Sequence, residues 1–338
     1  MKRRSGTLVV LLAGTAWLLA SQTGPRKRMK VEFRPLPLSD ASAASALKLV
    51  DAGGLALLYA TPDGPLGSNL SVARLNGGTP RSESLGNLGS LPERPSWDAI
   101  PAEGGAFSVV VTESGSAVSA LSLMNTRTRE SATVNRYDGF GVFGAPHFVK
   151  GDAGSISSVA LEGSKQRPVL FPLEPDGGYA KFRAVDAPIE GTIQDARLIR
   201  AAKGYLLFAK VMAIGASTSA RREASGRVIY PGILKYVSLN SELHSGDPPA
   251  RPLGGQLLID FDACAYGDGV AIFAATPKGY VIATGKLTNG VFAQDTWKEE
   301  PYPRPLGSPS ILAVGSKLYA AAVAAGPPPF QVVMAEVK

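Results

Sequence analysis

The chain has one cysteine, Cys264, and two histidines, His147 and His244, among its 338 residues. One thiol cannot close an intrachain disulfide, so packing must stabilise the fold. Cys264 lies in the apolar segment FDACAYG, where we expect a buried thiol that behaves as a small hydrophobic side chain. Two histidines exclude multi-histidine metal centres and make a histidine-based catalytic triad hard to assemble. We therefore expect no metal ion and no cofactor.

Acidic residues are missing from the first 30 positions, which hold seven Lys and Arg residues. Subtracting these seven from the 35 Lys and Arg of the whole chain leaves 28, equal to the 28 Asp and Glu. The net charge of +7 therefore belongs to the N-terminal segment, and the body of the protein is neutral. A neutral body argues against a nucleic-acid partner.

The N-terminal segment has the pattern of an export leader. Three basic residues, Lys2 to Arg4, precede an apolar stretch from Leu8 to Ala20, which predicts a signal peptide over residues 1–24. The uncharged stretch from Ser5 to Pro25 is also long enough for an uncleaved membrane anchor. Both interpretations place the body outside the cytoplasm, either secreted or periplasmic, or anchored to the membrane by the N-terminal helix.

Sequence motifs for catalysis are missing or lack their structural context. No G-x-S-x-G segment is present. Gly139, Gly141 and Gly144 match the G-x-G-x-x-G spacing of dinucleotide sites, but Pro146 follows at once and no helix pattern appears. We therefore interpret this segment as a loop.

Glycine-marked turns recur along the chain, each followed by a short apolar strand. Successive turns are separated by 51, 49, 50, 65 and 46 residues. A period near fifty residues with several short strands per unit is typical of a β-propeller. The sequence therefore predicts an all-β, six-bladed propeller over residues 25–338, and we expect a monomer. The marker glycines are Gly54, Gly105, Gly154, Gly204, Gly269 and Gly315.

Each repeat predicts a blade of four antiparallel strands. The innermost strand precedes the marker glycine, and a nearly uniformly apolar second strand follows it, as expected when neighbouring blades cover both of its faces. Asp-Gly pairs between these strands suit hairpin turns better than calcium loops, which need more oxygen ligands. Outermost strands are clear only in RESATV from Arg129 and AKFRAV from Ala180.

The last repeat ends after its third strand, at Lys338. The segment MKVEFRPL from Met29 precedes the first blade and has no other place in the repeat. We expect it to supply the missing outer strand and to close the ring, which would also protect an open sheet edge.

One face of the disc is the predicted binding surface. Connections between blades and loops between second and third strands emerge on the same side, which we call the loop face. Loops on a rigid scaffold commonly carry binding residues, and aromatic and arginine side chains anchor sugars or proteins. Those assigned to this face are Arg94, Trp97, Tyr137, Phe140, Phe143, His147, Tyr302, Arg304 and Phe330. Structural alternatives are a satisfied strand histidine at His147 and aromatic side chains that fill gaps between blades.

The fourth repeat is longer by about fifteen residues than the period of the others. The polar segment MAIGASTSARREASGR from Met212 separates its second and third strands. Such a segment is either a mobile loop or a docking loop that uses Arg221 and Arg222.

The export leader and six repeats resemble secreted propellers of the sialidase-like superfamily. FRPLP from Phe33 resembles the Arg-Ile-Pro start of sialidases, with Arg34 at the arginine position. The resemblance implies a glycan-acting hydrolase. The repeated Ser-x-Asp-x-Gly-x-Thr-Trp boxes of that family are absent, and DTW from Asp295 is an isolated fragment.

The missing site chemistry favours a non-catalytic function. We expect an extracytoplasmic binding or scaffold module for a protein or carbohydrate partner, with no catalytic residues. The alternative is the sialidase-like hydrolase. A hydrolase predicts a deep central pocket with several arginines and at least two carboxylates, whereas a scaffold predicts a plugged channel.

Overall fold

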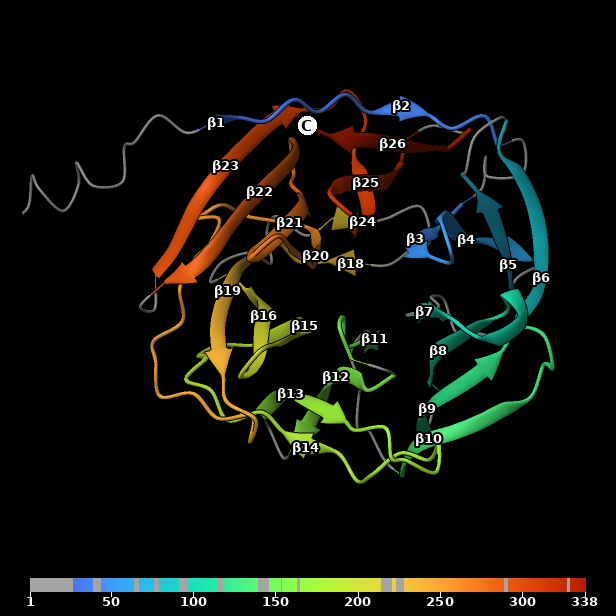
Figure 1. Cartoon of the computed structure of the whole chain (residues 1–338), viewed down its shortest axis with the longest axis horizontal. Helices are drawn as coiled ribbons and strands as arrows, with labels where there is room; N and C mark the ends of the chain where they lie inside the picture. Colours follow the sequence, from blue (N-terminus) through green and yellow to red (C-terminus); the bar gives the residue numbers. More distant parts are fainter. Residues whose placement is uncertain are drawn as a thin grey trace, which may run out of the picture.

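The computed structural model describes residues 27–38, 44–63, 67–75, 79–90, 97–114, 118–138, 146–152, 154–162, 165–213, 221–222, 228–288, 291–326 and 329–338. Six sheets stand around a central axis, and the chain visits them in order (Figure 1). The protein is therefore a six-bladed β-propeller, which confirms the prediction from the repeat. The predicted leader, residues 1–24, lies outside the described residues. Within them, no helix is long and apolar enough to cross a membrane.

The first strand of each blade lies next to the axis (Figure 1). These inner strands match the six predicted ones. They are β3 (Ala46–Asp51), β7 (Trp97–Pro101), β11 (His147–Phe148), β15 (Ile193–Ala201), β20 (Asp260–Tyr266) and β24 (Leu306–Val314).

Second and third strands follow in antiparallel order away from the axis. The second strands are β4 (Leu55–Asp63), β8 (Phe107–Ser114), β12 (Ile156–Glu162), β16 (Gly204–Met212), β21 (Gly269–Ala275) and β25 (Lys317–Ala324). The third strands are β5 (Gly67–Arg74), β9 (Val118–Asn125), β13 (Lys165–Phe171), β19 (Gly232–Leu239), β22 (Gly279–Thr288) and β26 (Gln331–Val337).

The outer strands differ most from the sequence prediction. The segments expected to form β10 (Ser131–Asp138) and β14 (Arg183–Ala184) are strands, although β14 has only two residues. Strands β6 (Arg81–Ser90) and β23 (Val291–Pro301) were not predicted from the sequence. Their polar residues suit an edge that faces solvent and therefore lack the apolar pattern of an inner strand.

The ring closes where the prediction places the closure. Strand β2 (Arg34–Pro35) pairs antiparallel with β26 as the fourth strand of blade six. Upstream, the backbones of Lys30 and Lys338 exchange hydrogen bonds of 2.6 and 3.0 Å. The ring of Phe33 packs 5.5 Å from Phe273 and 5.0 Å from Tyr280, between centroids. Strand β1 (Lys27–Arg28) adds a parallel pairing to β23 of blade five, which the sequence did not predict.

The hydrophobic core consists of layers between neighbouring blades. In β21, Ala271, Phe273 and Ala275 face the layer shared with blade six. The alternate residues Val270, Ile272 and Ala274 face the layer shared with blade four. Because successive side chains of a strand point to opposite faces, a strand covered on both sides must be apolar throughout.

Gly204 illustrates why glycine marks the turns. It has a φ of +144°, a conformation that residues with a Cβ rarely adopt. A Cβ at this position would lie 2.1 Å from the carbonyl oxygen of Leu239. The turn between β15 and β16 therefore requires glycine for both backbone conformation and space.

Blade four has three regular strands, whereas each of the other five described blades has at least four. The connection to blade five covers the edge of β19 through two isolated bridges, Tyr236 to Ala250 and Gly232 to Leu258. Strand β17 (Arg221–Arg222) lies in the predicted polar segment and pairs with β18 (Val228–Ile229), which directly follows that segment. Seen down the axis, β18 projects onto the middle of the ring (Figure 1).

Candidate functional site

One polar residue on the inner strand of each blade faces the axis region. Each precedes the marker glycine of its blade by five to seven residues. We call this set the axial ring: Lys48, Asp98, His147, Arg197, Asp262 and Ser310. All six are buried. The signal was present in the sequence as a polar residue inside each apolar inner strand, but only His147 entered the predicted site.

Hydrogen bonds from the axial ring join one inner strand to the next. The backbone N–H of Phe148 donates to Asp98 Oδ2 over 3.0 Å. The N–H of Ile311 donates to Asp262 Oδ2 at the same distance, and that of Leu49 donates to Ser310 Oγ. These side chains therefore connect the backbones of neighbouring blades.

Two ion pairs and one hydrogen bond join the remaining pairs of neighbouring blades. Lys48 Nζ lies 3.6 Å from Asp98 Oδ1, and His147 Nε2 lies 3.2 Å from Asp195 Oδ1. Asp195 also pairs with Arg197, whose Nη2 donates to the carbonyl oxygen of Phe261 in blade five over 3.1 Å. Each blade is thus joined to the next through a polar contact near the axis.

Each buried carboxylate of the axis is paired with a cation. Asp98 pairs with Lys48, Asp195 with Arg197, and Asp262 with Lys150. Asp262 is completely buried and accepts a 3.1 Å hydrogen bond from Lys150 Nζ. Buried charges are tolerated when they are paired and hydrogen-bonded in this way. Lys48 Nζ has ion pairs with Asp98 and Asp262 but no hydrogen-bond partner among the described residues.

The carboxylates stay ionised. Burial raises the pKa of the Asp98 carboxyl, but Lys48 and His147 outweigh this effect and lower its pKa to about 2. Burial opposes ionisation of Asp195 and Asp262 as well, yet neighbouring cations hold the pKa of both carboxyls below its ordinary value. A general acid or base works best with a pKa near the operating pH. The arrangement is suited to joining strands rather than to transferring protons.

The structure does not bring the predicted binding residues together into one cluster. Trp97 packs in the core between blades one and two, and His147 belongs to the axial ring. Tyr302 is partly buried, with its ring centroid 6.1 Å from that of Phe33. Phe330 is partly buried in the layer between blades six and one. These four therefore pack against the protein and do not form one exposed cluster.

The other predicted residues give no further cluster. Arg304 Nη1 donates to the carbonyl oxygen of Pro329 over 3.0 Å, next to Phe330. Tyr137 lies on β10, opposite Ser119 of β9. Arg94, Phe140 and Phe143 lie outside the described residues. Whether any of the nine residues binds a partner remains a prediction.

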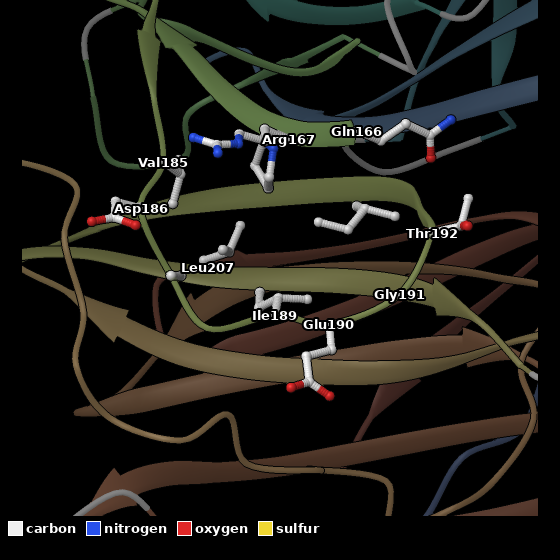
Figure 2. A pocket seen from close by; sticks show the side chains of 12 residues that line it. Gln166, Arg167, Val185, Asp186, Ile189, Glu190, Gly191, Thr192 and Leu207 are labelled. Carbon is white, nitrogen blue, oxygen red and sulfur yellow. The ribbon is translucent and has the colours of Figure 1, made fainter. Parts of the chain in front are cut away.

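A pocket lies in the crevice between blades three and four (Figure 2). Its volume is about 640 Å³, within the usual range for ligand sites. One wall is the beginning of β13, and another is the connection between the two blades. The lining residues are Gln166, Arg167, Pro168, Val185, Asp186, Ala187, Ile189, Glu190, Gly191, Thr192, Ile193 and Leu207.

The structure also bears on two other predictions, the absence of a metal site and the position of Arg34. In the described part of the chain, no three His, Cys, Asp or Glu side chains form a group that could hold a metal ion. Arg34 lies on the outer strand of blade six, exposed and paired with Glu32 at 3.0 Å. This position is remote from the axis, as the closure prediction implies.

Comparison with known proteins supports the fold alone. No protein-family model matches the sequence, and no curated protein matches it. Solved structures of Trypanosoma rangeli sialidase are similar in fold. The complex with sialic acid is 10% identical with a TM-score of 0.51, and the match covers 93% of this chain and 58% of that one. The complex with the inhibitor DANA is 9% identical with a TM-score of 0.54, covering 92% and 60%. This chain thus spans about 60% of the sialidase chains.

Proposed function

We propose that this protein is an extracytoplasmic, non-catalytic binding or scaffold module that recognises a protein or carbohydrate partner. The proposal rests on the observation that buried, paired side chains lie at the axis of the propeller. Lys48, Asp98, His147, Arg197 and Asp262 are buried and engaged with one another. The export leader predicted from the sequence supports the location outside the cytoplasm.

Access argues against catalysis at the axis. Asp98, Asp195 and Asp262 are 5%, 9% and 0% exposed, so a substrate would have to displace paired charges to reach them. Breaking a buried ion pair costs about 3 to 5 kcal/mol. A binding module does not require that rearrangement.

A sialidase-like hydrolase is the second candidate, and it rests on the likeness of fold to the sialidase structures. Fold alone is weak support for an activity. Among the described residues of the axial ring there is one arginine, Arg197, and it is paired with Asp195. The predicted hydrolase site, with several arginines around a central pocket, is not supported by this arrangement.

A measurement of glycan turnover distinguishes the binding module from the hydrolase. The purified body would be incubated with sialylated and neutral oligosaccharides, and released sugar and retained glycan would both be measured. We expect no released sugar above a buffer control, and binding either to a glycan or to the peptides described below. Release of sialic acid or another sugar would contradict the proposal, as would failure to bind either class.

A further inference from the structure

The pocket between blades three and four is lined by polar and aliphatic side chains and by no aromatic ring. Ile189, Ile193, Leu207, Val185 and Pro168 line it. Carbohydrate sites commonly use aromatic faces as anchors, and none of the lining residues supplies one. The aliphatic part of the lining suits an aliphatic side chain, and the polar part suits the polar groups that flank it in a peptide.

Exposed apolar side chains continue from one end of the pocket. The N–H of Met212 donates to the carbonyl oxygen of Thr192, a lining residue, over 2.9 Å. Met212 pairs with Gly232, which is bridged to Leu258. Hydrogen-bonded chain segments therefore lie side by side from the pocket to the beginning of blade five.

These segments carry the three exposed large hydrophobic side chains of the described residues. Met212, Tyr230 and Leu257 are 37%, 38% and 36% exposed. Met212 ends the second strand β16, Tyr230 lies just before the third strand β19, and Leu257 lies just before the inner strand β20. All three therefore lie on the loop face. An apolar group next to a pocket is typical of a surface that binds a protein.

The rim of the pocket carries an unpaired carboxylate. Asp186 Oδ2 lies 2.8 Å from His244 Nδ1, so this acid has a partner. Glu190 is exposed, and its carboxylate makes no ion pair or hydrogen bond with the residues that the structure describes. Lys235 Nζ donates to the backbone oxygen of Glu190 over 2.9 Å. Burial lowers the pKa of Lys235, and the nearby charge of Glu190 opposes this effect. A cationic group of a partner would therefore share this exposed acid with Lys235.

Two backbone N–H groups beside the pocket are also available to a partner. Glu190 and Gly191 are exposed to solvent, and their N–H groups make no hydrogen bond within the described chain. Such groups can donate to the carbonyl oxygens of an extended peptide, which is a common mode of peptide recognition.

We propose that this surface docks an extended peptide segment of a partner protein, with an aliphatic side chain in the pocket and a neighbouring Lys or Arg beside Glu190. The proposal rests on the binding function proposed above and names its site and partner. Aliphatic lining residues without an aromatic ring, an exposed carboxylate and open backbone donors together favour a polypeptide over a sugar.

The test is a selection from a displayed library of random short peptides against the folded, full-length body. We expect enriched peptides to share an aliphatic residue next to Lys or Arg. Fluorescence anisotropy of one enriched peptide should show binding about tenfold weaker, or worse, for both Ile189→Lys and Glu190→Lys. Glu83→Lys makes the same charge change on exposed β6 of blade one and should bind like the parent.

Several outcomes would overturn the proposal. These are no enrichment of the aliphatic and basic pair, unchanged affinity in Glu190→Lys, or an equal loss in Glu83→Lys. Since Ile189 is partly buried, thermal unfolding checks that its variant is folded, and the exposed Glu190 variant provides an independent measurement. Glycan binding abolished by Ile189→Lys would assign the pocket to carbohydrate while leaving a binding function in place. Glycan turnover would instead contradict the proposed function itself.

Discussion

The axis of the propeller and the crevice between blades three and four both contain charged residues, but they use them differently. At the axis, Asp98 and Asp262 are buried and bonded to the backbone of the next blade. At the crevice, Glu190 is exposed beside a pocket of about 640 Å³. A high density of charge therefore does not identify a ligand site in this protein. Charge at the axis holds blades together, and charge available to a partner lies further out.

Removing the closing segment should produce the largest loss of stability. A chain that lacks residues 1–38 loses the burial of Met29, Val31 and Phe33 against blades five and six. Fully burying one such side chain contributes about 1.5 to 3 kcal/mol, so we expect a loss of about 4 kcal/mol or more. Denaturant unfolding measures this loss. Removal of residues 1–24 alone is the control, and an equal midpoint for the two truncated chains would disprove closure by this segment.

Asp262→Ala should produce the next largest loss. It removes the acceptor for Lys150 Nζ and for the N–H of Ile311, and leaves buried cations without their partner. Breaking a buried ion pair in this way costs about 3 to 5 kcal/mol. Asp268→Ala removes an acid from an exposed pair with Lys286 and should leave the denaturant midpoint unchanged. Similar midpoints for the two variants would show that the axial charges do not stabilise the ring.

Acid should destabilise the protein through the carboxylates of the axis. The pKa of Asp98 is lowered from 3.8 to about 2 in the folded protein. The lower folded-state pKa stabilises the protein at a pH above the unfolded-state value, and that stability is lost as pH falls through the folded-state value. We expect the free energy of unfolding to change little between about pH 7 and 5 and to fall between about pH 4 and 2, with about 2 kcal/mol due to Asp98.

The variant Asp98→Asn isolates this contribution. Its free energy of unfolding should be lower than that of the parent at neutral pH and should fall less steeply in acid. Urea titrations at several pH values measure both slopes. Parallel curves for parent and variant would mean that Asp98 has the same pKa in the folded and unfolded states.

Glu190→Lys should have the smallest effect on stability. Its side chain is exposed and unpaired among the described residues, so we expect a change within about 0.5 kcal/mol. Thermal unfolding measures it. A loss as large as that of Asp262→Ala would mean that the crevice, like the axis, serves the fold, and the difference between the two regions would disappear.

Strand positions could be predicted because each depends on local residues. A turn such as that at Gly204 needs positive φ, and a strand such as β21 is apolar on both faces because two blades cover it. Strands β6 and β23 escaped prediction because edge strands face solvent and can be polar. The bridge from Ala250 to Tyr236 on blade four has no local pattern at all.

The site was harder to predict than the fold. Trp97 and Phe330 were assigned to the loop face by their position in the repeat, yet both pack against the core. Repeat position fixes which end of a strand a residue occupies, but its exposure depends on the neighbouring blade. Residues of the pocket, such as Ile189 and Glu190, lie in a connection whose sequence has no motif.

Composition and spacing were sufficient for the number of blades, the order of their strands and the closure by the N-terminal segment, since these follow from turn chemistry and from the burial of alternating residues. The pairing of Asp98 with Lys48, and of Asp195 with His147, arises only when inner strands of neighbouring repeats meet at the axis. The open crevice likewise depends on how two blades and their connection pack. Such contacts join residues far apart in the chain, and local sequence places no constraint on which of them come into contact.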